Sequence, residues 1–86
     1  MPCAKIVQQS GSSDGRGYVV KHMGNLRIWF TLLSDGALRL DKTTCTKEAQ
    51  GILAMFQTCD KSENGFLTEA QSRLASMPNW TIRRAV

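Results

Sequence analysis

The clearest pattern in the sequence is Leu26-Arg27-Ile28-Trp29-Phe30-Thr31-Leu32-Leu33, where apolar residues alternate with other types. A period of two is typical of a β-strand, because successive side chains point to opposite faces of a sheet. One face of the predicted strand would carry four apolar side chains, those of Leu26, Ile28, Phe30 and Leu32. The opposite face would carry Arg27, Trp29 and Thr31.

Turn signals on both sides of this stretch predict two further strands. Gly24-Asn25 is a typical two-residue hairpin turn, and it follows a predicted strand over residues 18–23. Ser34-Asp35-Gly36 turns the chain again, before a predicted strand over residues 37–41. We therefore expect a three-stranded antiparallel meander. Ahead of it, residues 10–17 have the composition of a loop, and residues 4–9 could form a short strand.

The second half of the chain changes from a period of two to a helical period. Apolar residues recur at i, i+3, i+4 and i+7 in Ala49, Ile52, Leu53 and Phe56, with Thr46 as the predicted N-cap. A second stripe predicts another helix, which Pro78 would end at about Met77; this stripe consists of Phe66, Ala70, Leu74 and Met77. Beyond it, Trp80 and Ile82 alternate with Thr81 and Arg83, as in a short edge strand.

These elements predict an α+β fold in one domain over residues 1–86, with a small antiparallel sheet packed on a two-helix hairpin. Terminal strands could extend the three-stranded meander. The apolar faces of the strands and helices should meet in one core, and we expect it to contain Leu26, Ile28, Phe30, Leu38, Leu40, Ile52, Leu53, Phe56 and Leu74.

Composition excludes several classes of protein. Apolar types make up 42% of the chain and charged types 21%, as in globular domains. The longest apolar stretch is too short to cross a membrane, and no secretory signal precedes it, so we expect a cytoplasmic protein. Three cysteines are an odd number, which argues against a complete disulfide framework, and their spacing fits no zinc site. We expect them to be packing residues and expect no cofactor.

The sequence offers no set of catalytic side chains. The single histidine, His22, lies on a predicted strand without an evident acidic partner, and Asp35 and Asp41 lie in predicted turns. No glycine-rich phosphate loop joins a predicted strand to a helix. We therefore expect a protein that is not an enzyme.

The segment from Asp60 to Gln71 resembles a calcium-binding EF-hand loop. Oxygen-bearing side chains stand at its positions one, three, five and nine, and glycine stands at position six. Gln71 replaces the bidentate glutamate of position twelve, which leaves Asp60 as the one anionic ligand. The alternative is a helix-to-helix turn followed by a capping box at Thr68 and Gln71. The metal candidates are Asp60, Ser62, Asn64, Phe66, Thr68 and Gln71, and we expect at most a weak site.

The basic, aromatic face of the predicted sheet is the candidate binding surface. Tryptophan and arginine are enriched at binding hot spots. Depending on strand register, Lys21 or His22 would join this face, whose candidate residues are Arg27, Trp29, Thr31, Arg39 and Lys21. The alternative is that a terminal segment covers Trp29 in a second small core. Binding would then move to the helices around Lys47, Gln50 and Arg73.

Two functions remain open for this surface. The first is an adaptor or inhibitor that covers a partner protein, in the style of small phage or mobile-element proteins, as a monomer or small homo-oligomer. The second is a nucleic-acid-binding domain, because the net charge is +4 and residues 17–56 resemble the three-strand-plus-helix layout of some DNA-binding modules. We favour protein binding, since the charge excess is modest.

Overall fold

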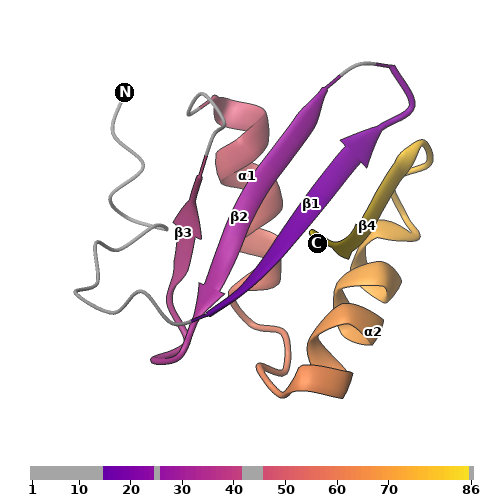
Figure 1. The fold of residues 1–86 in the computed structure, drawn as a ribbon. Helices are drawn as coiled ribbons and strands as arrows, with labels where there is room; N and C mark the ends of the chain where they lie inside the picture. Colours follow the sequence, from indigo (N-terminus) through magenta and orange to yellow (C-terminus); the bar gives the residue numbers. More distant parts are fainter. Residues whose placement is uncertain (1–14, 25, 42–45, 86) are drawn as a thin grey trace.

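The computed structural model describes residues 15–24, 26–41 and 46–85 and confirms the α+β class. Four antiparallel strands form one sheet in the order β3-β2-β1-β4 (Figure 1). The meander and the C-terminal edge strand are confirmed, whereas the strand predicted over residues 4–9 lies outside the described residues. The elements are β1 (Gly15–His22), β2 (Arg27–Leu33), β3 (Leu38–Leu40), α1 (Lys47–Phe56), α2 (Glu63–Leu74) and β4 (Trp80–Arg84).

The first strand begins at Gly15, so the prediction of a loop is wrong for residues 15–17. Gly15 pairs with Leu33 and Gly17 with Thr31. A Cβ atom at Gly15 would lie 2.6 Å from Cγ2 of Thr31 and 2.7 Å from the carbonyl oxygen of Leu32. Glycine is therefore required at position 15, where β1 closely approaches β2, although the composition of residues 10–17 is typical of a loop.

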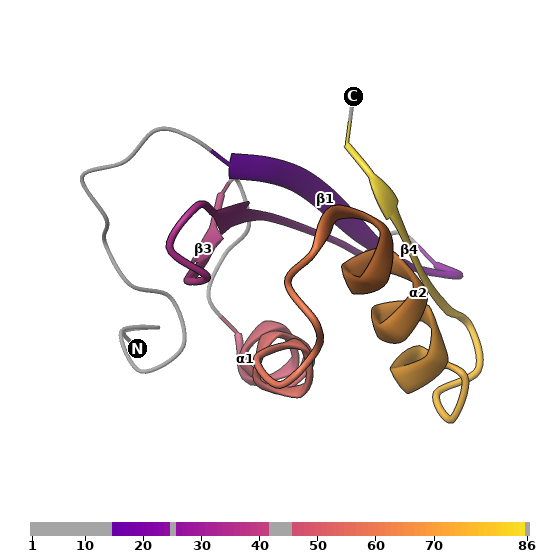
Figure 2. The same ribbon diagram turned by 90° about the horizontal axis from the view of Figure 1, so that it is seen from below.

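Both helices cover the same face of the sheet (Figure 2), and the core lies between them. Its centre is a group of aromatic rings with centroids 5.0–6.2 Å apart, contributed by Tyr18, Phe30, Phe56 and Phe66. Most of the predicted core is confirmed. Leu40 is only partly buried at the margin of the core, and Leu26 is half-buried because it precedes the first residue of β2.

The two helices begin at capping side chains. Thr46 caps α1 as predicted, because its Oγ1 accepts the N–H of Ala49 at 3.1 Å. The second helix begins at Glu63, where Ser62 is the N-cap and accepts the N–H of Gly65 at 3.1 Å. The capping box predicted at Thr68 is therefore wrong. Thr68 lies inside α2 and donates to the carbonyl of Asn64 at 3.2 Å.

The second helix also ends at Leu74, three residues before the predicted end at Met77. The earlier start places the fully buried Phe66 on a helical turn, where it packs against Tyr18. Each of Ser62 and Thr68 can cap a helix, and this long-range contact favours the earlier position.

Three cations hold the linker between the helices. Lys61 donates from Nζ to the carbonyls of Gln57 and Cys59. Arg16 donates to the carbonyl of Lys61 at 2.8 Å, and Arg73 donates to that of Met55 at 2.9 Å. The bonds to Met55 and Gln57 satisfy carbonyls at the C-terminal end of α1, and those to Cys59 and Lys61 satisfy carbonyls of the linker.

Candidate binding face on the sheet

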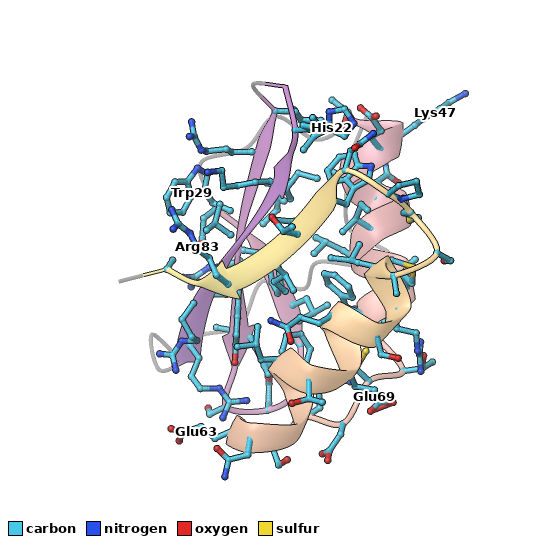
Figure 3. The ribbon with its side chains drawn as sticks, turned by 90° about the vertical axis from the view of Figure 1, so that its right-hand side faces the viewer. His22, Trp29, Lys47, Glu63, Glu69 and Arg83 are labelled. Atoms are coloured by element: carbon cyan, nitrogen blue, oxygen red, sulfur yellow. The ribbon has the colours of Figure 1, made fainter. Side chains whose placement is uncertain are left out.

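The face of the sheet away from the helices holds the side chains that we expected to bind a partner. The strand register shows which side chains lie on this face, because alternate residues of every strand point to the same side. Figure 3 shows Trp29 and Arg83 pointing to this side, opposite the helices. We call this surface the outer face, and it consists of Gly17, Val19, Lys21, Arg27, Trp29, Thr31, Leu33, Arg39, Asp41, Thr81 and Arg83.

Two cations lie directly opposite each other on this face. Lys21 of β1 pairs with Arg27 of β2. The next residue of β1, His22, donates its backbone N–H to Leu26 at 3.0 Å. Hydrogen-bonded and non-hydrogen-bonded pairs alternate in an antiparallel ladder, so Lys21 and Arg27 form the closer, non-hydrogen-bonded kind of pair. Like charges in such a pair repel and reduce the stability of the sheet.

Trp29 lies at the centre of the outer face and is half-buried. It stands opposite Val19, which is 1% exposed, and Leu33 on the same face is 2% exposed. The outer face therefore has a small apolar centre as well as charged side chains. Trp29 is neither fully exposed nor part of the main core. Its burial is therefore intermediate between the two alternatives that the sequence left open, an exposed binding residue and a residue covered in a second small core.

Thr31, Arg39 and Asp41 form a connected group beside Trp29. Thr31 donates from Oγ1 to Asp41 at 2.6 Å, and Nε of Arg39 lies 3.2 Å from the other carboxylate oxygen of Asp41. The backbone N–H of Asp41 donates to the carbonyl of Trp29 at 2.9 Å. Thr31 is only 9% exposed, so the surrounding packing holds its hydroxyl in place. The hydroxyl positions the carboxylate of Asp41, which in turn positions Arg39.

Arg83 was missed as a member of this face. It is exposed and pairs with Val19 from the neighbouring strand. The alternation in residues 80–83 indicated a strand, but the sequence contains no signal that places this strand next to β1. With three intervals of about 4.8 Å between adjacent strands, the cations extend across about 14 Å from β3 to β4.

Charge is distributed unequally between the two sides of the sheet. The described outer face carries four cations and one acid, Asp41. The helical side carries four acids, Glu48, Asp60, Glu63 and Glu69, together with five cations, which are Arg16, Lys47, Lys61, Arg73 and Arg84. Among the described residues, the excess of positive charge is therefore largest on the outer face, where it would attract an anionic surface.

His22 has the contacts of a packing and turn residue. Its ring lies against that of Trp80, with centroids 4.8 Å apart. Its Nδ1 accepts the backbone N–H of Gly24 at 3.3 Å, within the turn that leads to β2. The sheet register directs Lys21, and not His22, to the outer face.

The segment that resembles an EF-hand loop is largely helical, because α2 covers residues 63–71 of it. Asn64, Phe66, Thr68 and Gln71 therefore point in successive directions around a helix axis. Asp60 accepts the N–H of Ser62 at 2.9 Å and its hydroxyl at 3.1 Å, which lowers the pKa of the Asp60 carboxyl. In the described residues, no three His, Cys, Asp or Glu side chains gather as metal ligands would.

The alternative surface on the helices is less well formed. Lys47 is exposed at the start of α1, and Gln50 is half-buried one turn later. Arg73 is engaged by Met55, by Thr58 at 2.8 Å and by Glu69 at 3.4 Å. These three side chains form no group comparable to that of the outer face.

Neither helix in the described part of the chain is long and apolar enough to cross a membrane. Comparison with known proteins identifies no relative: no family model, no curated protein and no solved structure matches this chain.

Proposed function

We propose that this protein is a non-enzymatic binding module that covers an acidic surface of a partner protein with its outer face. The observation that carries the proposal is the gathering of four cations around Trp29 with one acid, whereas four acids lie on the opposite, helical side. Arginine and tryptophan are enriched at the centres of protein interfaces. Lys21 and Arg27 lie opposite each other on this face, so an acidic group of the partner could contact both cations at once.

The centre of the outer face favours a protein over a nucleic acid. Asp41 lies in it, hydrogen-bonded to Thr31 and ion-paired with Arg39. A carboxylate at this position repels phosphate groups, whereas a protein surface can offer it a donor. Half-buried Trp29 and the apolar side chains beside it also suit a partner with mixed polar and apolar contacts.

The test is capture from a lysate of the source cell, with and without nuclease, by the protein and two matched variants. Lys21→Glu and Lys47→Glu make the same chemical change, the first on the outer face and the second on α1. We expect a nuclease-resistant partner that Lys21→Glu captures at least about tenfold more weakly and that Lys47→Glu captures normally.

Three results would contradict the proposal. Loss of capture after nuclease treatment, with a steep dependence on salt, would indicate a nucleic acid. Loss of capture with Lys47→Glu alone would place the contact on the helices. Equal capture by both variants would exclude the outer face as the binding surface.

A further inference from the structure

The last strand of the sheet has one neighbour, so its other edge is available for pairing. Among the described residues, β4 pairs with β1 alone. The N–H of Met23 donates to the carbonyl of Asn79 at 2.8 Å, and the N–H of Ala85 donates to that of Gly17 at 2.9 Å. Because hydrogen-bonded pairs alternate along an antiparallel ladder, Thr81 and Arg83 also direct their backbone groups to β1.

The residues between them direct their backbone groups away from the sheet. These are Trp80, Ile82 and Arg84. The N–H of Trp80 is taken by the carbonyl of Met77 at 3.3 Å. Ile82 and Arg84 therefore offer the donors of this edge. Figure 3 views the molecule from this side, where β4 crosses the foreground above α2 and no other described element lies in front of it.

A cleft follows the same edge. It has a volume of about 240 Å³ and lies between the C-terminal half of α2 and β4, lined by Gln71, Leu74, Ala75, Trp80, Thr81 and Ile82. A strand added to β4 would place the side chain opposite Ile82 on the helical side of the sheet. That side chain would enter the cleft beside Leu74 and Ala75, so the cleft suits a medium-sized apolar residue.

The charge of this edge indicates which charge the bound segment carries. Arg83 and Arg84 are both exposed and point to opposite faces of the sheet. Arg84 lies over the ring of Tyr18 at 5.4 Å and donates to the carbonyl of Gly17 at 3.3 Å, so its guanidinium group is held in place. Residues 79–85 contain no acid. A second copy of this strand would add further arginines, whereas an acidic segment would neutralise those present.

From this edge, cleft and charge we propose that β4 binds an extended, acidic segment of a partner protein by strand addition. The segment extends the sheet to five strands through backbone hydrogen bonds to Ile82 and Arg84. It places an apolar side chain in the cleft and carboxylates beside Arg83 and Arg84. Peptide recognition by an exposed sheet edge uses these same components, in which the backbone provides affinity and side-chain pockets provide specificity. This edge is a second contact surface, separate from the centre of the outer face.

The test measures fluorescence anisotropy with a labelled peptide that has two glutamates followed by alternating valine and threonine. The control peptide replaces both glutamates with lysine. Two variants make a matched pair: Arg84→Ala removes the charge, and Arg84→Pro removes the charge together with the outward N–H. Proline is tolerated on an edge strand where its missing N–H faces away from the sheet. Thermal unfolding shows whether each variant folds.

We expect saturable binding of the acidic peptide, at least about tenfold weaker binding of the lysine peptide, and a further loss of about tenfold from Arg84→Ala to Arg84→Pro. Ala75→Phe, which fills the cleft and leaves the sequence of β4 unchanged, should weaken binding even where Arg84→Pro does not fold. Trp29→Ala should leave peptide binding unchanged, which separates this inference from the proposed function.

Equal binding of the two peptides, or equal affinity of the two Arg84 variants, would overturn the inference. So would the absence of binding, since the arginines would then only protect an edge from aggregation. Sedimentation that shows a dimer through β4 would make a second copy the occupant, and would also overturn it.

Discussion

The two faces of one sheet differ in what their side chains do. On the inner face Tyr18 and Phe30 are fully buried and pack against aromatic rings of both helices. On the outer face the cations Lys21 and Arg27 lie opposite each other, next to a tryptophan that is half-buried. Alternate residues of the same two strands therefore meet different demands. The inner face maintains the fold, and the outer face carries the features of a contact surface.

The largest expected effect tests the inner face. Phe56→Ala should reduce the free energy of unfolding by about 3–5 kcal/mol, because it empties space beside two aromatic neighbours, Phe30 and Phe66, in a small core. Urea denaturation followed by circular dichroism measures the loss. A loss below about 1 kcal/mol would show that this face does not hold the fold.

Trp29→Ala should be less destabilising, at about 1–2 kcal/mol, because the side chain is half-buried beside Val19. The same denaturation experiment measures it, in a Trp80→Phe background if fluorescence is used. Destabilisation as large as that of Phe56→Ala would place Trp29 in a second core and remove the contrast between the two faces.

The start of α2 gives a prediction of intermediate size on the helical side. Ser62→Ala should cost about 1 kcal/mol, because it removes the acceptor for the N–H of Gly65. Thr68→Ala is the matched control and should cost clearly less, since Thr68 bonds to a carbonyl within the helix. The reverse order of the two losses would restore the helix start at Thr68.

The smallest predicted effect has the opposite sign. Lys21→Glu should stabilise the protein by about 0.2–1 kcal/mol, because it converts a like-charge pair with Arg27 into an opposite-charge pair. The same change should weaken partner binding. A thermal unfolding midpoint that falls, or one that rises without any loss of capture, would contradict this combination of effects.

Much of the fold follows from periodicity within short segments. The alternation around Trp29 and the helical stripe of Ile52 and Phe56 each depend on neighbouring residues, so the sequence alone indicates them. The position of β4 beside β1 depends on pairing between residues about 60 positions apart, such as Val20 with Ile82. No local pattern encodes that pairing, and for this reason Arg83 was not assigned to the outer face.

Local signals also misled where tertiary packing decides between alternatives. Residues 15–17 have a loop composition, yet they begin β1, and Gly15 lies where β2 leaves no space for a Cβ atom. Ser62 and Thr68 both match an N-cap, and the burial of Phe66 favours Ser62. The EF-hand-like spacing of residues 60–71 depends on a loop, and the earlier helix start replaces that loop with helical turns.

The most direct test of the outer face is the acetylation rate of individual lysines, measured by mass spectrometry with and without the captured partner. Lys21 lies on the outer face, and exposed Lys47 at the start of α1 is the internal control. We predict that the partner slows acetylation of Lys21 by about tenfold or more and leaves Lys47 unchanged. Protection of Lys47 with no change at Lys21 would contradict the account.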